Sequence, residues 1–307
     1  MRATRGARLV EPTVLARIDD LELIARGVVA GVISGLHSSP HMGRSVDFAE
    51  HRAYMPGDDI RLIDWRVFAR TDRFYVKQFE ADSNANFLVL LDVSRSMDYG
   101  SAGITKLHYA RCLAACLAYL AGQQRDRVGL ITFSDRVVDY VPPAAKHRDV
   151  VLRTLENVTA SGGGGLAEPM VAAADACRRR GVAVLISDLY EDPEVALEAL
   201  RRLGHRAGDV IVFHVLDPAE RSFPFDGAAT YENLEGDESL PVVASEVREQ
   251  YRKLIEEHIA TLKQRLGGHG IDYLLTETSA PLDDVLVRYL TRRQRLNRVR
   301  RRWVSSS

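Results

Sequence analysis

The sequence has 307 residues, enough for one large α/β domain with additions or for two small domains. Hydrophobic residues make up 46% and charged residues 27%, values close to the average for soluble globular proteins, which excludes a wholly disordered or coiled-coil chain. The 41 basic and 42 acidic side chains nearly cancel, so no global field attracts nucleic acid or anionic lipid.

The three cysteines, Cys112, Cys116 and Cys177, lie in apolar, alanine-rich segments, where a free thiol behaves as a small hydrophobic group. Their odd number, the lack of a Cys-x-x-Cys pair and the lack of an apolar leader after Met1 favour a reducing compartment. Residues 27–36, the longest weakly polar stretch, are far fewer than the roughly 20 apolar residues that span a bilayer. We therefore expect a cytoplasmic protein without membrane insertion.

The first part of the chain divides into two segments. Apolar residues at helical spacing over residues 12–36 predict one or two amphipathic helices, so residues 1–40 form an N-terminal helical segment. Residues 41–82 follow as a segment dense in charge and turn residues, which we expect to pack on the main domain.

Short apolar runs alternate with helical segments from residue 74 onward. The predicted strands are residues 74–79, 87–91, 127–133, 182–186, 210–215 and 271–276, and the predicted helices include residues 104–121, 147–158, 167–179 and 243–266. Because a strand exposed on one face would alternate polar and apolar residues, these runs indicate a sheet covered on both faces. We predict an α/β fold with a doubly wound, mostly parallel sheet and helices on both faces over residues 83–290, and a basic C-terminal tail over residues 291–307.

Two predicted strands deliver aspartates to the same edge of this sheet. Asp92 follows the run 87–91 and is continued by Ser94 and Ser96, and Asp188 follows the run 182–186. In open α/β sheets, loops at the carboxyl ends of the strands form the binding crevice. Carboxylate and hydroxyl oxygens suit a hard cation, Mg²⁺ or Mn²⁺, whose open position would accept a carboxylate from another protein. The same residue types also terminate strands and cap helices, which is the structural alternative.

The Asp-x-Ser-x-Ser run resembles the metal-ion-dependent adhesion site of the von Willebrand factor A superfamily. The resemblance implies that Asp92, Ser94, Ser96 and Asp188 are metal ligands or hold the ligands in place. Family members commonly read Gly-Gly-Thr-Asp-Leu in the next loop, whereas this chain has Gly164 at the threonine position. The missing hydroxyl leaves open whether a metal occupies the site, with water or a shifted Thr159 or Ser161 as possible substitutes.

An upstream segment gives a narrower resemblance. The run Arg-Ala-Tyr-Met-Pro-Gly-Asp-Asp-Ile-Arg-Leu-Ile-Asp-Trp over residues 52–65, followed by Ala69 and Arg70, resembles the signature of the bacterial domain of unknown function 58 family. The resemblance implies a chaperone-like adaptor that works with a MoxR-type AAA+ ATPase and with client proteins. From the charges we expect an ion-pair network around Trp65 as a buried anchor, acting as a structural buttress or as a docking surface. Its members are Arg52, Asp58, Asp59, Arg61, Asp64, Arg66 and Arg70.

Two other function classes are possible. A magnesium-dependent phosphohydrolase could use Asp92 as its nucleophile, but such enzymes usually need a second acid two residues on, where this chain has Ser94. Nucleic acid could bind the stretch 292–302, which contains seven arginines, although no aromatic residues interleave with them to stack bases. We therefore expect a metal-dependent binding module and not an enzyme, with no nucleic-acid partner.

Overall fold

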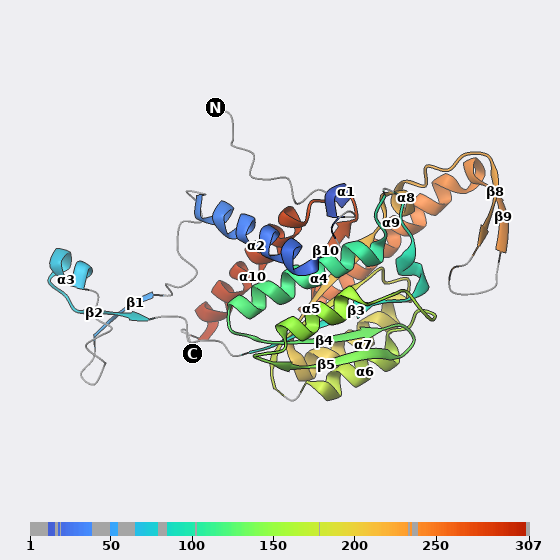
Figure 1. The fold of residues 1–307 in the computed structure, drawn as a ribbon. Helices are drawn as coiled ribbons and strands as arrows, with labels where there is room; N and C mark the ends of the chain where they lie inside the picture. Colours follow the sequence, from blue (N-terminus) through green and yellow to red (C-terminus); the bar gives the residue numbers. More distant parts are fainter. Residues whose placement is uncertain are drawn as a thin grey trace, which may run out of the picture.

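The computed structural model describes residues 12–15, 18, 20–38, 50–54, 65–78, 85–101, 103–177, 179–232, 234 and 239–304. Its centre is a six-stranded sheet in the order β10-β7-β6-β3-β4-β5 (Figure 1). The strands in chain order are β3 (Asn86–Asp92), β4 (Arg127–Phe133), β5 (Val137–Ala144), β6 (Gly181–Ser187), β7 (Gly208–Leu216) and β10 (Asp272–Glu277). All neighbouring pairs are parallel except β4 and β5. The predicted α/β fold class is thus confirmed.

Helices cover both faces of the sheet (Figure 1). One face packs against α2 (Leu21–Ser38), α4 (Lys106–Gln123), α5 (Arg148–Glu156) and α10 (Leu282–Val304), and the other against α6 (Ala167–Ala176), α7 (Pro193–Ala207) and α9 (Ala244–Gly268). In β3, Phe87 and Val89 pack on the first face while Leu88 and Leu90 pack on the second. Because successive strand side chains point to opposite faces, a strand buried on both must be apolar throughout, as the sequence is.

The strand order reverses beside β3. The chain runs from β3 outward to β4 and β5 and then crosses back to place β6 on the other side of β3. Such a switch point opens a crevice at the carboxyl ends of the two flanking strands, and this is where open α/β sheets bind their ligands. The carboxyl ends of β3 and β6 carry the two aspartates that the sequence singles out.

Several elements differ from the sequence prediction. Residues 137–144 form an antiparallel edge strand, β5, that the sequence did not indicate. The predicted strand at residues 74–79 is β2 (Tyr75–Gln78), which pairs with β1 (Glu50–Ala53) outside the central sheet. A second hairpin joins β8 (Ala228–Glu232) and β9 (Ser239–Val243).

The basic stretch near the C-terminus continues a helix. α10 starts with side chains buried in the core, namely Leu282, Val285, Leu286 and Tyr289, and extends through Val304. The predicted boundary between residues 290 and 291 therefore falls inside this helix. The short elements α1 (Pro12–Leu15), α3 (Trp65–Thr71), η2 (Arg95–Asp98, a 3₁₀ helix) and α8 (Pro218–Ser222) complete the described secondary structure.

Trp65 is not the buried anchor expected from the sequence. Its side chain is 59% exposed and makes edge-to-face contacts with Phe68 and Phe74, which belong to the same segment. Phe68 and Phe74 stack on each other with ring centroids 4.4 Å apart. Asp58, Asp59, Arg61 and Asp64 of the expected ion-pair network lie outside the described residues.

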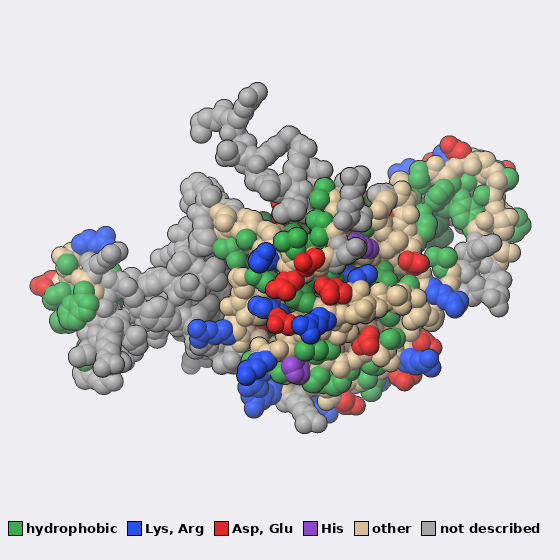
Figure 2. Space-filling view, viewed as in Figure 1, with side chains coloured by type: hydrophobic (Ala, Val, Ile, Leu, Met, Phe, Trp, Pro, Cys, Tyr) green, Lys and Arg blue, Asp and Glu red, His purple; other side chains and the backbone are tan. Residues whose placement is uncertain are grey.

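Hydrophobic side chains also gather on the hairpin of β8 and β9 (Figure 2). Leu240 is 64% exposed there, and Leu254, on the adjoining half of α9, is 57% exposed. Within the part of the chain that the structure describes, no helix combines the length and apolar character that crossing a membrane requires.

Candidate metal centre at the carboxyl edge of the sheet

Asp92 and Asp188 meet at the switch point. Asp92 is the last residue of β3, and Asp188 directly follows β6, which pairs with β3 in parallel. Both are buried, and Oγ of Ser187 donates a 2.6 Å hydrogen bond to Oδ2 of Asp92. The two predicted acids therefore share one edge of the sheet.

The two predicted serines lie beside Asp92. The backbone N–H and the hydroxyl of Ser94 both donate to Oδ1 of Asp92, at 2.9 and 2.7 Å. The hydroxyl oxygen of Ser96 lies 3.1 Å from that of Ser94. This geometry arises because the chain leaves β3 and turns at once into the 3₁₀ helix η2, with Ser94 as the residue before it. Two hydroxyls and a carboxylate thus gather within one short loop.

The electrostatics of this edge disfavour the ionised form of Asp92. Burial, reinforced by the negative charge of Asp188, raises the pKa of Asp92 to about 7, even though Ser187 and Ser94 donate to its carboxylate. Two ionised carboxylates in a buried site repel each other, and a cation between them would relieve that repulsion.

The glycine loop contributes main chain to the site. The Ser161 N–H donates to the carbonyl of Val93 at 2.7 Å, and the Arg95 N–H donates to the carbonyl of Gly162 at 3.4 Å. Gly162 has a φ of +73°, and a Cβ there would lie 2.7 Å from the hydroxyl oxygen of Ser134, so glycine is required. The loop therefore lies against the Asp-x-Ser-x-Ser turn, but Gly164 offers no side-chain hydroxyl to a metal.

A buried lysine that the sequence analysis missed completes the site. The ammonium of Lys106 lies 2.7 Å from Oδ2 of Asp188 and 2.5 Å from Oε1 of Glu220. It also lies 4.9 Å from the centroid of the Tyr190 ring, within range of a cation–π contact. Burial opposes the charged form, but the two carboxylates outweigh it and raise the pKa of Lys106.

Local signals for these residues exist in the sequence. Lys106 is a single lysine at the start of a long apolar helical stretch. Glu220 stands three residues after Asp217, and the two form a capping box at the start of α8, directly after β7. Neither signal reveals that residues 114 positions apart form an ion pair.

The oxygen donors fit a small divalent cation bound mainly through hydroxyls and water. Ser94 and Ser96 would hold it, and Asp92 and Asp188 would balance its charge, because Mg²⁺ keeps several waters and needs few protein carboxylates. Among the described residues, no group of three or more histidine, cysteine, aspartate or glutamate side chains is arranged to hold a metal. Carboxylate and hydroxyl oxygens are hard donors, which suit Mg²⁺ or Mn²⁺ better than metals that prefer thiolate or imidazole ligands.

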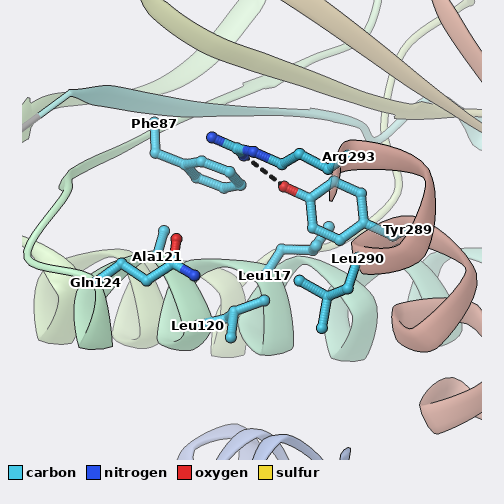
Figure 3. A pocket seen from close by; sticks show the side chains of 8 residues that line it. All are labelled: Phe87, Leu117, Leu120, Ala121, Gln124, Tyr289, Leu290 and Arg293. Atoms are coloured by element: carbon cyan, nitrogen blue, oxygen red, sulfur yellow. Dashed lines mark hydrogen bonds between the residues drawn. The ribbon is translucent and has the colours of Figure 1, made fainter. Parts of the chain in front are cut away.

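A pocket at the opposite end of the sheet is apolar (Figure 3). It lies between the amino end of β3, the last turns of α4 and the first half of α10, with Phe87, Leu120 and Leu290 among its lining residues. The guanidinium of Arg293 donates a 2.8 Å hydrogen bond to the hydroxyl of Tyr289 at its rim. The pocket shares no residue with the carboxyl edge.

The fold is an α/β fold of the von Willebrand factor A-like type, with a six-stranded, mostly parallel sheet. The chain belongs to the family described as "Protein of unknown function DUF58", whose model matches residues 50–261. The resemblance to this family that the sequence showed is thereby confirmed.

Relatives of similar length and similar solved structures were found. The uncharacterized proteins Rv1480 of Mycobacterium tuberculosis and Mb1516 of Mycobacterium bovis are each 28% identical over 292 residues, covering 93% of this chain and 91% of theirs. BatB from Bacteroides thetaiotaomicron, a conserved hypothetical protein, is 16% identical with a TM-score of 0.46, over 68% of this chain and 98% of that one. The von Willebrand factor A domain of SpRpn10 is 13% identical with a TM-score of 0.42, over 66% of this chain and 93% of that one.

Proposed function

We propose that this protein is a non-enzymatic binding module that binds partner proteins through a divalent cation at the carboxyl edge of its sheet. The observation that carries the proposal is the meeting of Asp92, Ser94, Ser96 and Asp188 at the switch point between β3 and β6. A cation held mainly by hydroxyls and water keeps much of its positive charge, so it can accept an aspartate or glutamate side chain from a partner.

Binding accounts for Asp92 better than nucleophilic catalysis does. Its carboxylate is only 5% exposed, and both of its oxygens accept hydrogen bonds from serines. A nucleophile needs a lone pair aimed at an accessible substrate and an acid to protonate the leaving group, and Ser94 stands where that acid would be. These features support a carboxylate that organises a site over one that attacks a phosphate ester.

A MoxR-type AAA+ ATPase is the partner that we propose, together with client proteins. The family membership supports this choice, because the resemblance to this family implied such an ATPase. In this role the module would present clients to the ATPase or couple ATP hydrolysis to their release.

Capture of a purified MoxR-type ATPase in magnesium and in chelator tests the proposal. We expect capture by the wild-type chain in magnesium only, and loss of capture by Asp92→Ala with the fold intact by circular dichroism. Asp175→Ala is the matched control, because Asp175 is an exposed aspartate on α6. Equal capture in both buffers would contradict the metal role.

Two assays separate the proposal from the other function classes. We expect no turnover of phosphate esters; a magnesium-dependent activity that Asp92→Ala removes would support the phosphohydrolase instead. We also expect no salt-dependent binding of nucleic acid that is lost when residues 292–307 are deleted, the behaviour that a nucleic-acid role for the arginines requires.

A further inference from the structure

Lys106 occupies a position that is unfavourable for a charged side chain on two grounds. It is the first residue of α4, where the helix dipole repels positive charge. Its side chain is fully buried, which penalises the charged ammonium. Strong compensating contacts must therefore keep a lysine at this place.

The contacts that offset the cost of burying the Lys106 ammonium come from two other elements of the fold. Asp188 approaches from the end of β6 and Glu220 from α8, and the ring of Tyr190 covers the ammonium. The ammonium is therefore an internal cation at the carboxyl edge, and it contacts one of the two acids that form the candidate metal centre.

We propose that Lys106 is the positioning residue of this edge: its ammonium holds Asp188 in place without a metal and competes with a divalent cation for that carboxylate. This inference rests on the proposed cation site. A divalent ion that draws on Asp188 must share it with a positive charge already 2.7 Å away. The site then keeps its shape when no cation is bound, and its affinity for a cation is low. The cation and the partner protein therefore bind to the site best when both are present.

The alternative is a purely structural ion pair that ties α4 to β6 and α8. Both roles predict that losing Lys106 destabilises the fold, because two carboxylates would remain buried without their counter-charge. Only the positioning role predicts a change in cation affinity, so affinity for Mg²⁺ and Mn²⁺ alone is the deciding measurement.

The experiment is calorimetric titration of the full chain with Mg²⁺ and with Mn²⁺, comparing wild type with Lys106→Met. We expect the variant to bind at least tenfold more tightly, and its thermal midpoint to rise more on adding Mg²⁺ than that of wild type. Lys146→Met is the matched control, because it deletes the same charge from an exposed position between β5 and α5 and should stay within twofold of wild type.

A double variant, Lys106→Met with Glu220→Gln, guards against misfolding. It removes one positive and one negative charge, so the net charge of the site is unchanged and no second carboxylate is left unpaired. We expect the double variant also to bind Mg²⁺ more tightly than wild type. The gain would then result from the release of Asp188 and not from a change of overall charge. Equal affinity in wild type and variants overturns the inference alone, whereas absence of binding in every protein overturns the cation site as well.

Discussion

The hydroxyl of Ser187 donates a 2.6 Å hydrogen bond to Oδ2 of Asp92, joining the end of β6 to the end of β3. The backbone N–H of Leu189 donates in turn to the same hydroxyl oxygen at 3.0 Å, which orients it. Residues 95 positions apart in the chain are thus connected by one side chain, and the loop that carries Asp188 is fixed relative to the Asp-x-Ser-x-Ser turn.

The raised pKa of Asp92 predicts how stability without metal depends on pH. Its pKa rises from 3.8 to about 7 on folding, so the folded state binds the extra proton between these values and loses stability as pH increases across them. In chelator, Asp92→Asn should gain stability relative to wild type across this range, by about 4 kcal/mol at pH 8. Urea unfolding at pH 4.5, 6 and 8 measures this difference. The exposed Asp149→Asn serves as control, and a difference that does not change with pH would contradict the assignment.

His214 predicts the opposite dependence in nearly the same range. Burial, helped by the neighbouring His258, lowers the pKa of His214 to about 3, and its Nδ1 lies 2.6 Å from the hydroxyl of Tyr273. Because only the unfolded chain takes up this proton between pH 6.5 and 3, wild type loses stability on acidification, by up to about 1.4 kcal/mol per pH unit. The advantage of wild type over His214→Asn should therefore shrink as pH falls. Urea unfolding of both proteins at pH 7.5, 6 and 5 tests this, and a constant advantage would show that His214 does not titrate as expected.

The two serines should separate cation binding from stability. Ser94→Ala removes a buried donor to Asp92 and should cost about 1–3 kcal/mol without metal. Ser96→Ala removes a half-buried hydroxyl that contacts Ser94, so its cost should be smaller, while its Mg²⁺ affinity should fall about tenfold, like other losses around metal sites. Denaturant unfolding in chelator and Mg²⁺ titration measure the two effects. If Ser96→Ala binds Mg²⁺ as wild type does, Ser96 is not a ligand.

Restoring the threonine of the related adhesion sites should strengthen the site. We expect Gly164→Thr to bind Mg²⁺ about tenfold more tightly, because it adds a hydroxyl donor to a loop that already lies against the Asp-x-Ser-x-Ser turn. Gly163→Thr is the matched control, since a Cβ there meets nothing within 4 Å and the loop gains the same stiffness. A similar gain in both variants would assign the effect to loop rigidity.

Much of the fold could be predicted because its central strands are buried on both faces. Continuous apolar runs place β3, β4, β6 and β7 within one or two residues of their ends, and the mixed run 271–276 does the same for the edge strand β10. β5 escaped prediction because it is an edge strand that alternates in exposure and contains Pro142 and Pro143, which cannot donate to a sheet ladder. The strands of the β8–β9 hairpin, which pair only with each other, carry no long buried run.

Part of the candidate site could be predicted for the same reason. Asp92 and Asp188 follow the two runs that flank the switch point, so strand ends alone bring them together. The partnership of Lys106 with Glu220 depends instead on how α4 and α8 pack over the edge, which no local pattern encodes. Trp65 was wrongly predicted to be buried because its aromatic neighbours come from its own segment.

Because α9 is long, a partner protein can approach the candidate cation from one side only. Its 25 residues extend about 37 Å, whereas the seven residues of β6 extend about 23 Å. Apart from Ala244, its buried residues start at Ile255, near the middle of the helix, and β10 follows α9 at the amino edge of the sheet. The first half and the β8–β9 hairpin therefore project past the edge that carries Asp92 (Figure 1). We expect these projecting elements to block a partner protein that has a broad, flat surface. A partner with a narrow protruding loop and an acidic residue at its tip should reach the site.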